Sequence, residues 1–190
     1  MEELKRAPVT VLLILANILV FTAVEFTGGS EDTMHMLTPA IMQGEYYRIF
    51  TSMFLHFGPQ HLGNNMLVLF VLGGRLERTV GKLKYLLIYL LGGMGGNLLC
   101  LFLELDSADF AVSAGASGAV FAVMGAMIYA VIRGRGHIED LSARQVVIMA
   151  AFSLYFGFTS EGVDNAAHVG GLICGFLLAV LLYHPSQRAG

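Results

Sequence analysis

Long apolar stretches separated by short polar or glycine-rich segments dominate this sequence. A helix that crosses a bilayer needs roughly 17–25 predominantly apolar residues, because the hydrocarbon core is about 30 Å thick. Six stretches come close to this length, and we predict a membrane-spanning helix in each, at about residues 9–26, 61–76, 85–103, 116–132, 143–158 and 165–183.

The connection between the first two stretches, residues 28–59, is long and irregular but too apolar for an ordinary solvated loop. It contains Pro39, the pair Tyr46-Tyr47 and Arg48 among several Met and Phe residues. Short amphipathic helices lying in the membrane interface would account for this composition. We therefore expect short helical pieces here.

The composition excludes a soluble protein. Of the 190 residues, 56% are hydrophobic and only 13% are charged, and the mean hydropathy is +0.70. A soluble domain of this length needs far more polar surface, and no polar stretch is long enough to fold alone. The sequence predicts a single all-α membrane domain over residues 1–190, with a bundle of six transmembrane helices and no internal repeat.

The positive charges predict the orientation of this bundle. One side of the membrane receives almost all of them, namely Lys5, Arg6, Arg75, Arg78, Lys82, Lys84, Arg133, Arg135, Arg144 and Arg188. The other side receives only Arg48, together with Glu104, Asp106, Asp109, Glu161 and Asp164. Because cytoplasmic loops are enriched in Lys and Arg, we expect both termini in the cytoplasm and a multi-pass protein of the cell membrane.

In this topology the second, fourth and sixth helices all start at the outer side, and each carries a polar group near its start. These are His61 and Asn65, which share one helix face at i, i+4 spacing, then Ser117, and then His168. Polar groups inside a membrane are costly and are functional by default. A shared depth favours a single site, although such residues also commonly serve only to bond helices together.

Ser117 lies in the tetrapeptide Gly115-Ala116-Ser117-Gly118. Small neighbours leave its hydroxyl uncovered, and free N–H groups at a helix start can stabilise an oxyanion. Such clusters are also common packing motifs, in which the serine bonds back to a carbonyl. Gly171 and Gly175 would let the sixth helix pack closely, and if its neighbour is the fourth helix, His168 can reach the Ser117 hydroxyl and take its proton.

Other chemistries lack their residues. There is no H-E-x-x-H zinc motif, the histidines have no Cys or carboxylate partners at ligand spacing, and no pair of intramembrane aspartates is present. Cys100 and Cys174 lie in apolar stretches as small core residues. A channel or transporter would need pore-lining charges or broken helices in matching halves, and the sequence shows neither. We expect no metal and no cofactor.

These motifs together resemble the rhomboid intramembrane serine proteases of the minimal six-span bacterial type, over nearly the whole chain. The family's G-x-S-G, A-H-x-x-G and H-x-x-x-N patterns match Gly115-Ala116-Ser117-Gly118, Ala167-His168-Val169-Gly170-Gly171 and His61-Leu62-Gly63-Asn64-Asn65. The resemblance implies that Ser117 is the nucleophile and His168 the base. It also implies an oxyanion hole formed by His61, Asn65 and the Ser117 N–H.

The resemblance assigns supporting positions and shows two departures. The supporting residues are Arg48, His56, Gly115, Gly118, Phe121, Gly171 and Gly175. Tyr47 stands where the family usually has Trp, and Phe121 stands where Tyr is frequent. The Phe121 ring can still stack on His168, but a hydroxyl is lost. Asp164 is expected to cap the sixth helix and not to hold the imidazole.

The implied partners are transmembrane protein substrates and the lipid bilayer, with no nucleic acid and with the oligomeric state left open. The expected activity is cleavage of single-span membrane proteins near the outer face. The fifth span, with bulky Phe152, Tyr155 and Phe156, is the wall expected to yield for lateral substrate access. The alternative is a catalytically silent rhomboid-like membrane-binding protein.

Overall fold

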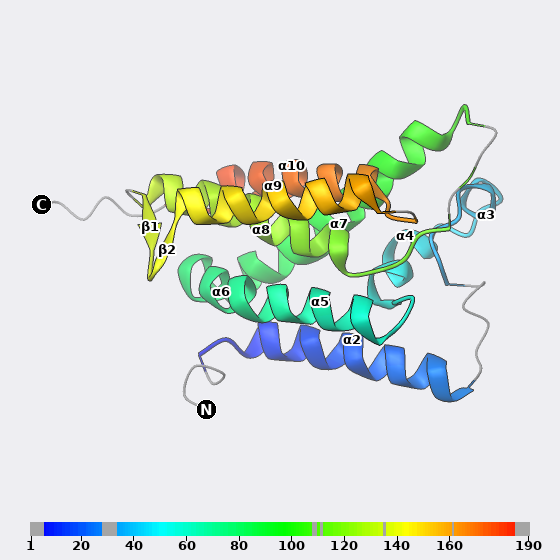
Figure 1. The fold of residues 1–190 in the computed structure, drawn as a ribbon, viewed down its shortest axis with the longest axis horizontal. Helices are drawn as coiled ribbons and strands as arrows, with labels where there is room; N and C mark the ends of the chain where they lie inside the picture. The colour runs from blue at the N-terminus through cyan, green and yellow to red at the C-terminus, as the bar shows by residue number, and fades with distance from the viewer. Residues whose placement is uncertain are drawn as a thin grey trace, which may run out of the picture.

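The computed structural model describes residues 6–27, 34–107, 110, 112–134, 136–160 and 162–184, which form a helical bundle (Figure 1). The long helices are α2 (Pro8–Thr27), α7 (Lys82–Glu104), α8 (Ser117–Arg133), α9 (Ala143–Thr159) and α10 (Asn165–Leu182). A further helical segment consists of α5 (Pro59–Val68), the π-turn η3 (Leu69–Gly73) and α6 (Gly74–Val80). Every predicted apolar stretch is therefore helical.

Three of these helices, α2, α7 and α10, are long and apolar enough to cross a membrane, so this is an integral membrane protein. α8 and α9 are apolar but shorter, at 17 residues each. The helix of the second predicted stretch continues past residue 76 to Val80. Charged residues interrupt the apolar pattern there, but one of them, Glu77, is buried. Its carboxylate accepts the N–H groups of Val9 and Thr10 at 3.0 and 2.8 Å and so caps α2.

The first connection forms the expected short helices, which are α3 (Thr38–Met42), α4 (Arg48–Thr51) and the 3₁₀ turn η2 (Ser52–Phe54). Arg48 holds this connection together from inside. Its side chain is buried and donates to the Glu45 carboxylate at 2.6 Å and to the His35 carbonyl at 3.0 Å. An antiparallel bridge between Met36 and Ser113 joins the connection to the segment before α8.

A short hairpin that the sequence pattern did not predict precedes α9. It consists of β1 (His137–Ile138) and β2 (Leu141–Ser142). Ser142 then caps α9 in a reciprocal capping box with Gln145. α2 begins and α10 ends at the same end of the molecule as this hairpin, whereas α3 and α4 lie at the opposite end (Figure 1). Among the charges used to predict orientation, Lys5, Asp109, Arg135, Glu161 and Arg188 lie outside the described residues.

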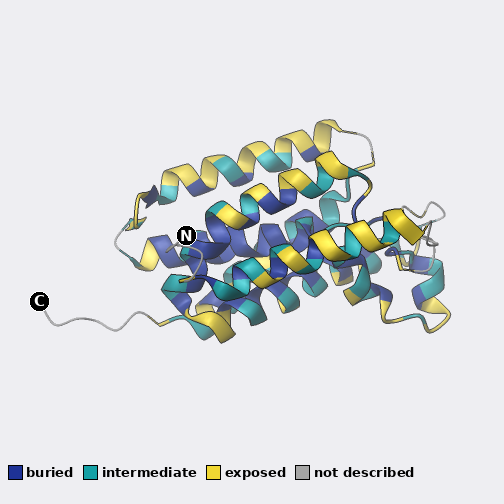
Figure 2. Cartoon of the chain, turned by 90° about the horizontal axis from the view of Figure 1, so that it is seen from below, coloured by how far each residue is buried: buried dark blue, intermediate teal, exposed yellow. Residues whose placement is uncertain are grey.

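The core is built around α8, which packs against both α7 and α10. Every residue of α8 from Gly118 to Met127 is buried, and the exposed faces belong to the surrounding helices (Figure 2). A methyl group at Gly171 would collide with the Gly118 carbonyl, and one at Gly175 with the carbonyl of Ala122. The close neighbour of the sixth stretch is therefore the fourth, which meets the condition stated for contact between Ser117 and His168. α9 is peripheral, with only Val146, Ala150 and Gly157 buried.

Candidate active site

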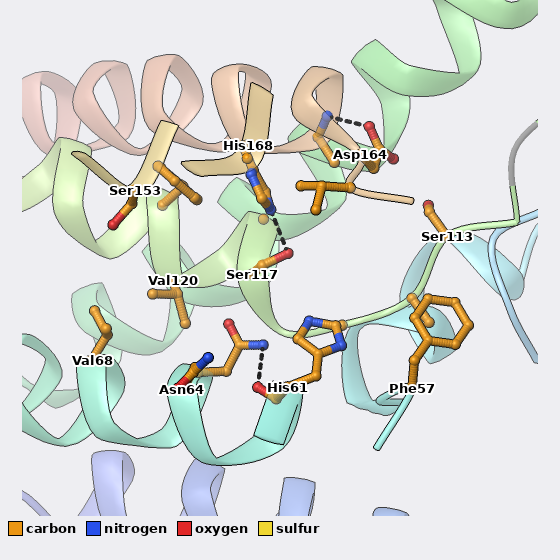
Figure 3. Close-up of a pocket in the computed structure, with 18 of the residues that line it drawn as sticks. Phe57, His61, Asn64, Val68, Ser113, Ser117, Val120, Ser153, Asp164 and His168 are labelled. Atoms are coloured by element: carbon orange, nitrogen blue, oxygen red, sulfur yellow. Dashed lines mark hydrogen bonds between the residues drawn. The ribbon is translucent and has the colours of Figure 1, made fainter. Parts of the chain in front are cut away.

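A cavity of about 610 Å³ lies among α5, α8, α9 and α10. Polar side chains from separate parts of the chain line it, including His61, Asn64, Asn65, Ser113, Ser117, Ser153, Asp164 and His168. In Figure 3, Ser117 at the start of α8 lies between His168 of α10 and His61 of α5. The four polar residues that the sequence placed at one depth therefore line one cavity.

Ser117 and His168 are joined directly. The Ser117 Oγ and His168 Nε2 atoms are 2.8 Å apart, although 51 positions separate the two residues. The His168 ring is buried and stacks on Phe121, with the ring centroids 4.4 Å apart and the planes inclined by 25°. The predicted stacking is therefore confirmed. In the tautomer in which Nε2 accepts the hydrogen of the Ser117 hydroxyl, the neutral ring carries its own hydrogen on Nδ1.

The turn before Ser117 requires the glycine that the motif supplies. Gly115 has φ of 135°, in the left-handed region, and a methyl group there would lie 2.7 Å from His61 Cε1. The Gly115 N–H donates to the Ser52 carbonyl at 2.9 Å. Behind it, the Asn97 amide donates to the Ser52 hydroxyl at 3.0 Å. Glycine thus permits both the backbone conformation and the approach of His61.

His56 supports the same turn through a hydrogen bond. The N–H of Ala116, the residue before Ser117, donates to His56 Nε2 at 3.4 Å. Burial lowers the pKa of His56 to about 4, and the neighbouring His61 lowers it further in the same direction. His56 is therefore neutral at pH 7 and its Nε2 can act as an acceptor.

His61 and Asn65 lie across the cavity from His168. The His61 ring is stacked with Phe57, with centroids 6.1 Å apart, and meets His56 edge-on at 5.0 Å. Asn65 is mostly buried, and its Nδ2 donates to the His61 carbonyl at 3.1 Å. An amide nitrogen has two hydrogens, so this bond leaves Asn65 a second one for a ligand.

Two other expected residues have clear structural roles. The Asp164 carboxylate accepts the Ala167 N–H at 2.8 Å, so Asp164 caps α10 as predicted. At Gly118 a methyl group would lie 3.5 Å from the Ala167 carbonyl oxygen, which is an ordinary contact. Gly118 contributes chiefly through its backbone, which meets Gly171.

The sequence interpretation missed several polar residues around the cavity, namely Ser52, Asn64, Asn97, Ser113, Ser153 and Asn165. Asn97 was recognisable, because it is a polar residue in the middle of an apolar, glycine-rich stretch. Ser52 has no comparable signal, since its role depends on backbone contacts made after folding. Within the described ranges, no three His, Cys, Asp or Glu side chains gather as a metal site would require.

Comparison with known proteins gives a consistent result. Residues 43–185 match the Rhomboid domain family. The chain is 35% identical to the rhomboid protease GluP of Bacillus subtilis over 95% of its own length, but it spans only 36% of that protein. It is 31% identical to the putative rhomboid protease YdcA of the same organism, covering 83% of this chain and 77% of the relative. It is 33% identical to the rhomboid protease AarA of Providencia stuartii, covering 90% and 71%. The chain belongs to the rhomboid family.

Proposed function

We propose that this protein is an intramembrane serine endopeptidase in which Ser117 and His168 form the catalytic dyad. The observation that carries the proposal is the 2.8 Å contact between Ser117 Oγ and His168 Nε2 within a cavity of an integral membrane protein that several polar side chains line. A hydroxyl paired with a buried neutral imidazole is the arrangement that activates serine as a nucleophile. The rhomboid proteases among its relatives support the same reaction.

The reaction is acyl transfer to Ser117. His168 Nε2 takes the hydroxyl proton while Oγ bonds to the substrate carbonyl carbon, and the π electrons move onto the carbonyl oxygen. The Ser117 N–H, His61 and the second Asn65 amide hydrogen supply donors for this oxyanion. The C–N bond then breaks as the imidazolium returns its proton to the leaving amine. Water attacks the acyl-enzyme with His168 again as the base.

The proposed setting is a bundle that crosses the cell membrane six times, with the hairpin end and both termini in the cytoplasm. Arg75 and Arg78 lie in α6, and Arg133 ends α8. Under the positive-inside rule these arginines favour a cytoplasmic location for that end of the bundle. Ser117 and His168 lie at the starts of α8 and α10, and in the proposed orientation these starts are in the outer half of the membrane. There the cavity can admit water for hydrolysis, which lipid excludes.

The orientation is tested by cysteine labelling on intact cells in a background in which Cys100 and Cys174 are replaced by Ala. Asp106→Cys lies after α7 and His137→Cys lies in the hairpin, and both positions are exposed. A membrane-impermeant maleimide should label the first and not the second. Labelling of only His137→Cys would reverse the orientation and place the dyad near the cytoplasm.

The catalytic assignment is tested with a fluorophosphonate probe and a single-span reporter substrate on purified protein. The unaltered protein should be labelled and should cut the reporter. Ser117→Ala and His168→Ala should lose both activities while unfolding at nearly the same temperature. A folded protein that neither labels nor cleaves would favour the silent, membrane-binding alternative. Substantial cleavage by folded Ser117→Ala would exclude this dyad.

A further inference from the structure

Two buried polar atoms beside the dyad have no assigned role. They are Nδ1 of His168 and Oδ1 of Asn165, and neither has a hydrogen-bond partner among the described residues. A buried polar group without a hydrogen bond destabilises the folded protein. Two such atoms next to a catalytic base therefore indicate a shared interaction.

The two atoms lie on the same side of α10, facing α9. His168 and Asn165 are spaced i, i+3, which places them on one helix face. A methyl group built on Gly157 of α9 would lie 2.5 Å from Asn165 Oδ1 and 3.4 Å from His168 Nδ1. The two atoms are therefore within about 6 Å of each other. Roughly two hydrogen-bond lengths, the span of one bridging water, cover that distance.

The hydrogen bonds of Asn165 fix which end of its amide is available. Its Nδ2 donates to the carbonyls of Gly157 and Val163, at 3.2 and 3.3 Å. The amide nitrogen is thus committed to two acceptors, and the oxygen is left as an acceptor for another group. His168 Nδ1 carries the hydrogen of the neutral ring when Nε2 faces Ser117, so it needs an acceptor.

We propose that Asn165 is a positioning residue for His168, accepting the Nδ1–H hydrogen bond through one bridging water. The proposal rests on the catalytic role of His168 and adds a third member to the proposed dyad. Stacking on Phe121 fixes the plane of the imidazole but not its direction. A rotation of the ring by 180° about the Cβ–Cγ bond would keep it in that plane, and so keep the stacking, but would place Cε1 instead of Nε2 toward Ser117. An acceptor at Nδ1 selects the productive direction.

Asp164 is the other acceptor near His168, and its contacts direct it elsewhere. Its Oδ1 accepts the Ala167 N–H and caps α10. Its Oδ2 is also buried without a hydrogen-bond partner among the described residues, and the carboxylate acts on Cys100 of α7. Asn165 instead contacts α9. The two residues therefore serve different sides of α10.

The same amide also joins the end of α9 to α10, so the test must separate ring positioning from the loosening of α9. The labelling rate of a small fluorophosphonate does this, because the probe needs an activated serine but no lateral access for a helix. Asn165→Leu removes the acceptor at similar volume and should slow labelling about tenfold to hundredfold, as for a misplaced catalytic group. Val146→Ala is the control, because it removes buried side-chain volume near the start of α9, away from Asn165. This variant should be labelled at the unaltered rate.

Asn165→Asp supplies a readout that loosening alone would not change. It keeps an acceptor beside Nδ1 and adds a negative charge, which favours the imidazolium. The acidic limb of the labelling rate against pH should move to higher pH by about one unit, an ordinary size for a neighbouring opposite charge. Asp164 and His61, the other titratable groups that act on the His168 charge, are the same in both proteins.

The outcomes are distinct. Slow labelling by folded Asn165→Leu and a shifted limb in Asn165→Asp would support the proposal. Labelling by folded Asn165→Leu at the unaltered rate would overturn it and leave only the contact with α9. If Asn165→Leu does not fold, the Asn165→Asp profile decides, and an unshifted limb overturns the proposal. Absence of labelling in the unaltered protein would instead remove the dyad itself.

Discussion

The proposed nucleophile, Ser117, depends on a turn that other residues hold in place. Gly115 allows the left-handed backbone, the Ser52 carbonyl receives its N–H, and His56 receives the N–H of Ala116. These contacts leave the Ser117 N–H at the first position of α8, where no carbonyl of the same helix can accept it. The donor and the nucleophile are therefore prepared by the same turn.

The oxyanion donors should matter less than the nucleophile. Asn65→Ala and His61→Ala should each reduce kcat by roughly 10²–10³-fold, the cost of one donor in a soluble serine protease. Activity should remain measurable, because the Ser117 N–H and the other donor persist. Cleavage of the reporter substrate by each purified variant is the measurement. Complete loss in both variants, with unchanged thermal unfolding, would indicate that one of them is the base.

His56 should make the protein less stable in acid. Its pKa is lowered from 6.5 to about 4 in the folded protein, so the unfolded chain binds the proton more readily. The contribution of neutral His56 to the free energy of unfolding is then fully present above about pH 6.5. It is lost as the pH drops toward 4, by up to about 3 kcal/mol. His56→Gln keeps an acceptor but cannot titrate. Thermal unfolding at pH 7.5 and 4.5 should show a smaller acid loss in this variant, and an equal loss would show that His56 is not responsible.

At the scale of whole helices, the apolar pattern predicted the positions well, because lipid imposes both length and composition on a spanning segment. α9 and α10 begin at the predicted residues 143 and 165. The pattern failed where polar groups are satisfied inside the protein. Glu77 ended the apolar stretch in the sequence but is buried as a cap for α2. The hairpin at residues 137–142 is too short to produce a periodic signal.

Part of the candidate site was also predictable, because polar residues stand out within apolar stretches. Ser117, His168, His61 and Asn65 are polar residues at helix starts of one predicted direction, and they line one cavity. Asn165 was not found, because an Asn at a predicted helix start is an ordinary capping residue. Its contact with Gly157 depends on how α9 packs against α10. The spacing of residues along one helix gives no information about that packing.

The contact between α8 and α10 predicts unequal effects of two similar substitutions. Gly175→Ala would bring a methyl group into collision with the Ala122 carbonyl. This substitution should lower the free energy of unfolding by about 1–3 kcal/mol. Gly63→Ala is the matched control, because a methyl group on this helical residue has no atom within 4 Å. It should be neutral or slightly stabilising. Thermal unfolding in detergent distinguishes them, and equal values would show that close helix contact is not limiting.

At the scale of the molecule, α9 is attached mainly at its two ends. At the hairpin end, Arg75 pairs with Asp140 at 2.9 Å and Arg78 pairs with Glu139 at 2.9 Å, so the hairpin is tied to α6. These arginines lower the pKa of both acidic residues, chiefly through hydrogen bonds. At the other end the Asn165 amide bonds the Gly157 carbonyl. Between the ends α9 buries few residues, and Phe152, Tyr155 and Phe156 are exposed. This supports the expectation that α9 is the wall that yields to a substrate.

The position of the dyad predicts where a substrate helix is cut. A helix hides its carbonyl groups in internal hydrogen bonds, so it must unwind before Ser117 can attack. Unwinding costs least near the interface, where water satisfies the released groups, and at Gly or other helix-weakening residues. Ser117 and His168 lie at the starts of α8 and α10, so in the proposed orientation we expect cleavage near the outer end of the substrate. Small residues at the cut suit the close backbone approach that serine attack needs.

A panel of single-span reporters tests this depth directly. Each carries the same small-residue, helix-weakened segment, placed at the outer end, at the bilayer centre or at the cytoplasmic end. Cleavage should be fastest at the outer end, and mass spectrometry of the products should place the cut within that segment. The Ser117→Ala protein is the control for background proteolysis. Equal rates at the centre and the outer end would mean that the starts of α8 and α10 do not set the depth of the reaction. A reporter in which the segment is replaced by Leu at the outer end should be cut slowly, because depth alone does not expose a carbonyl.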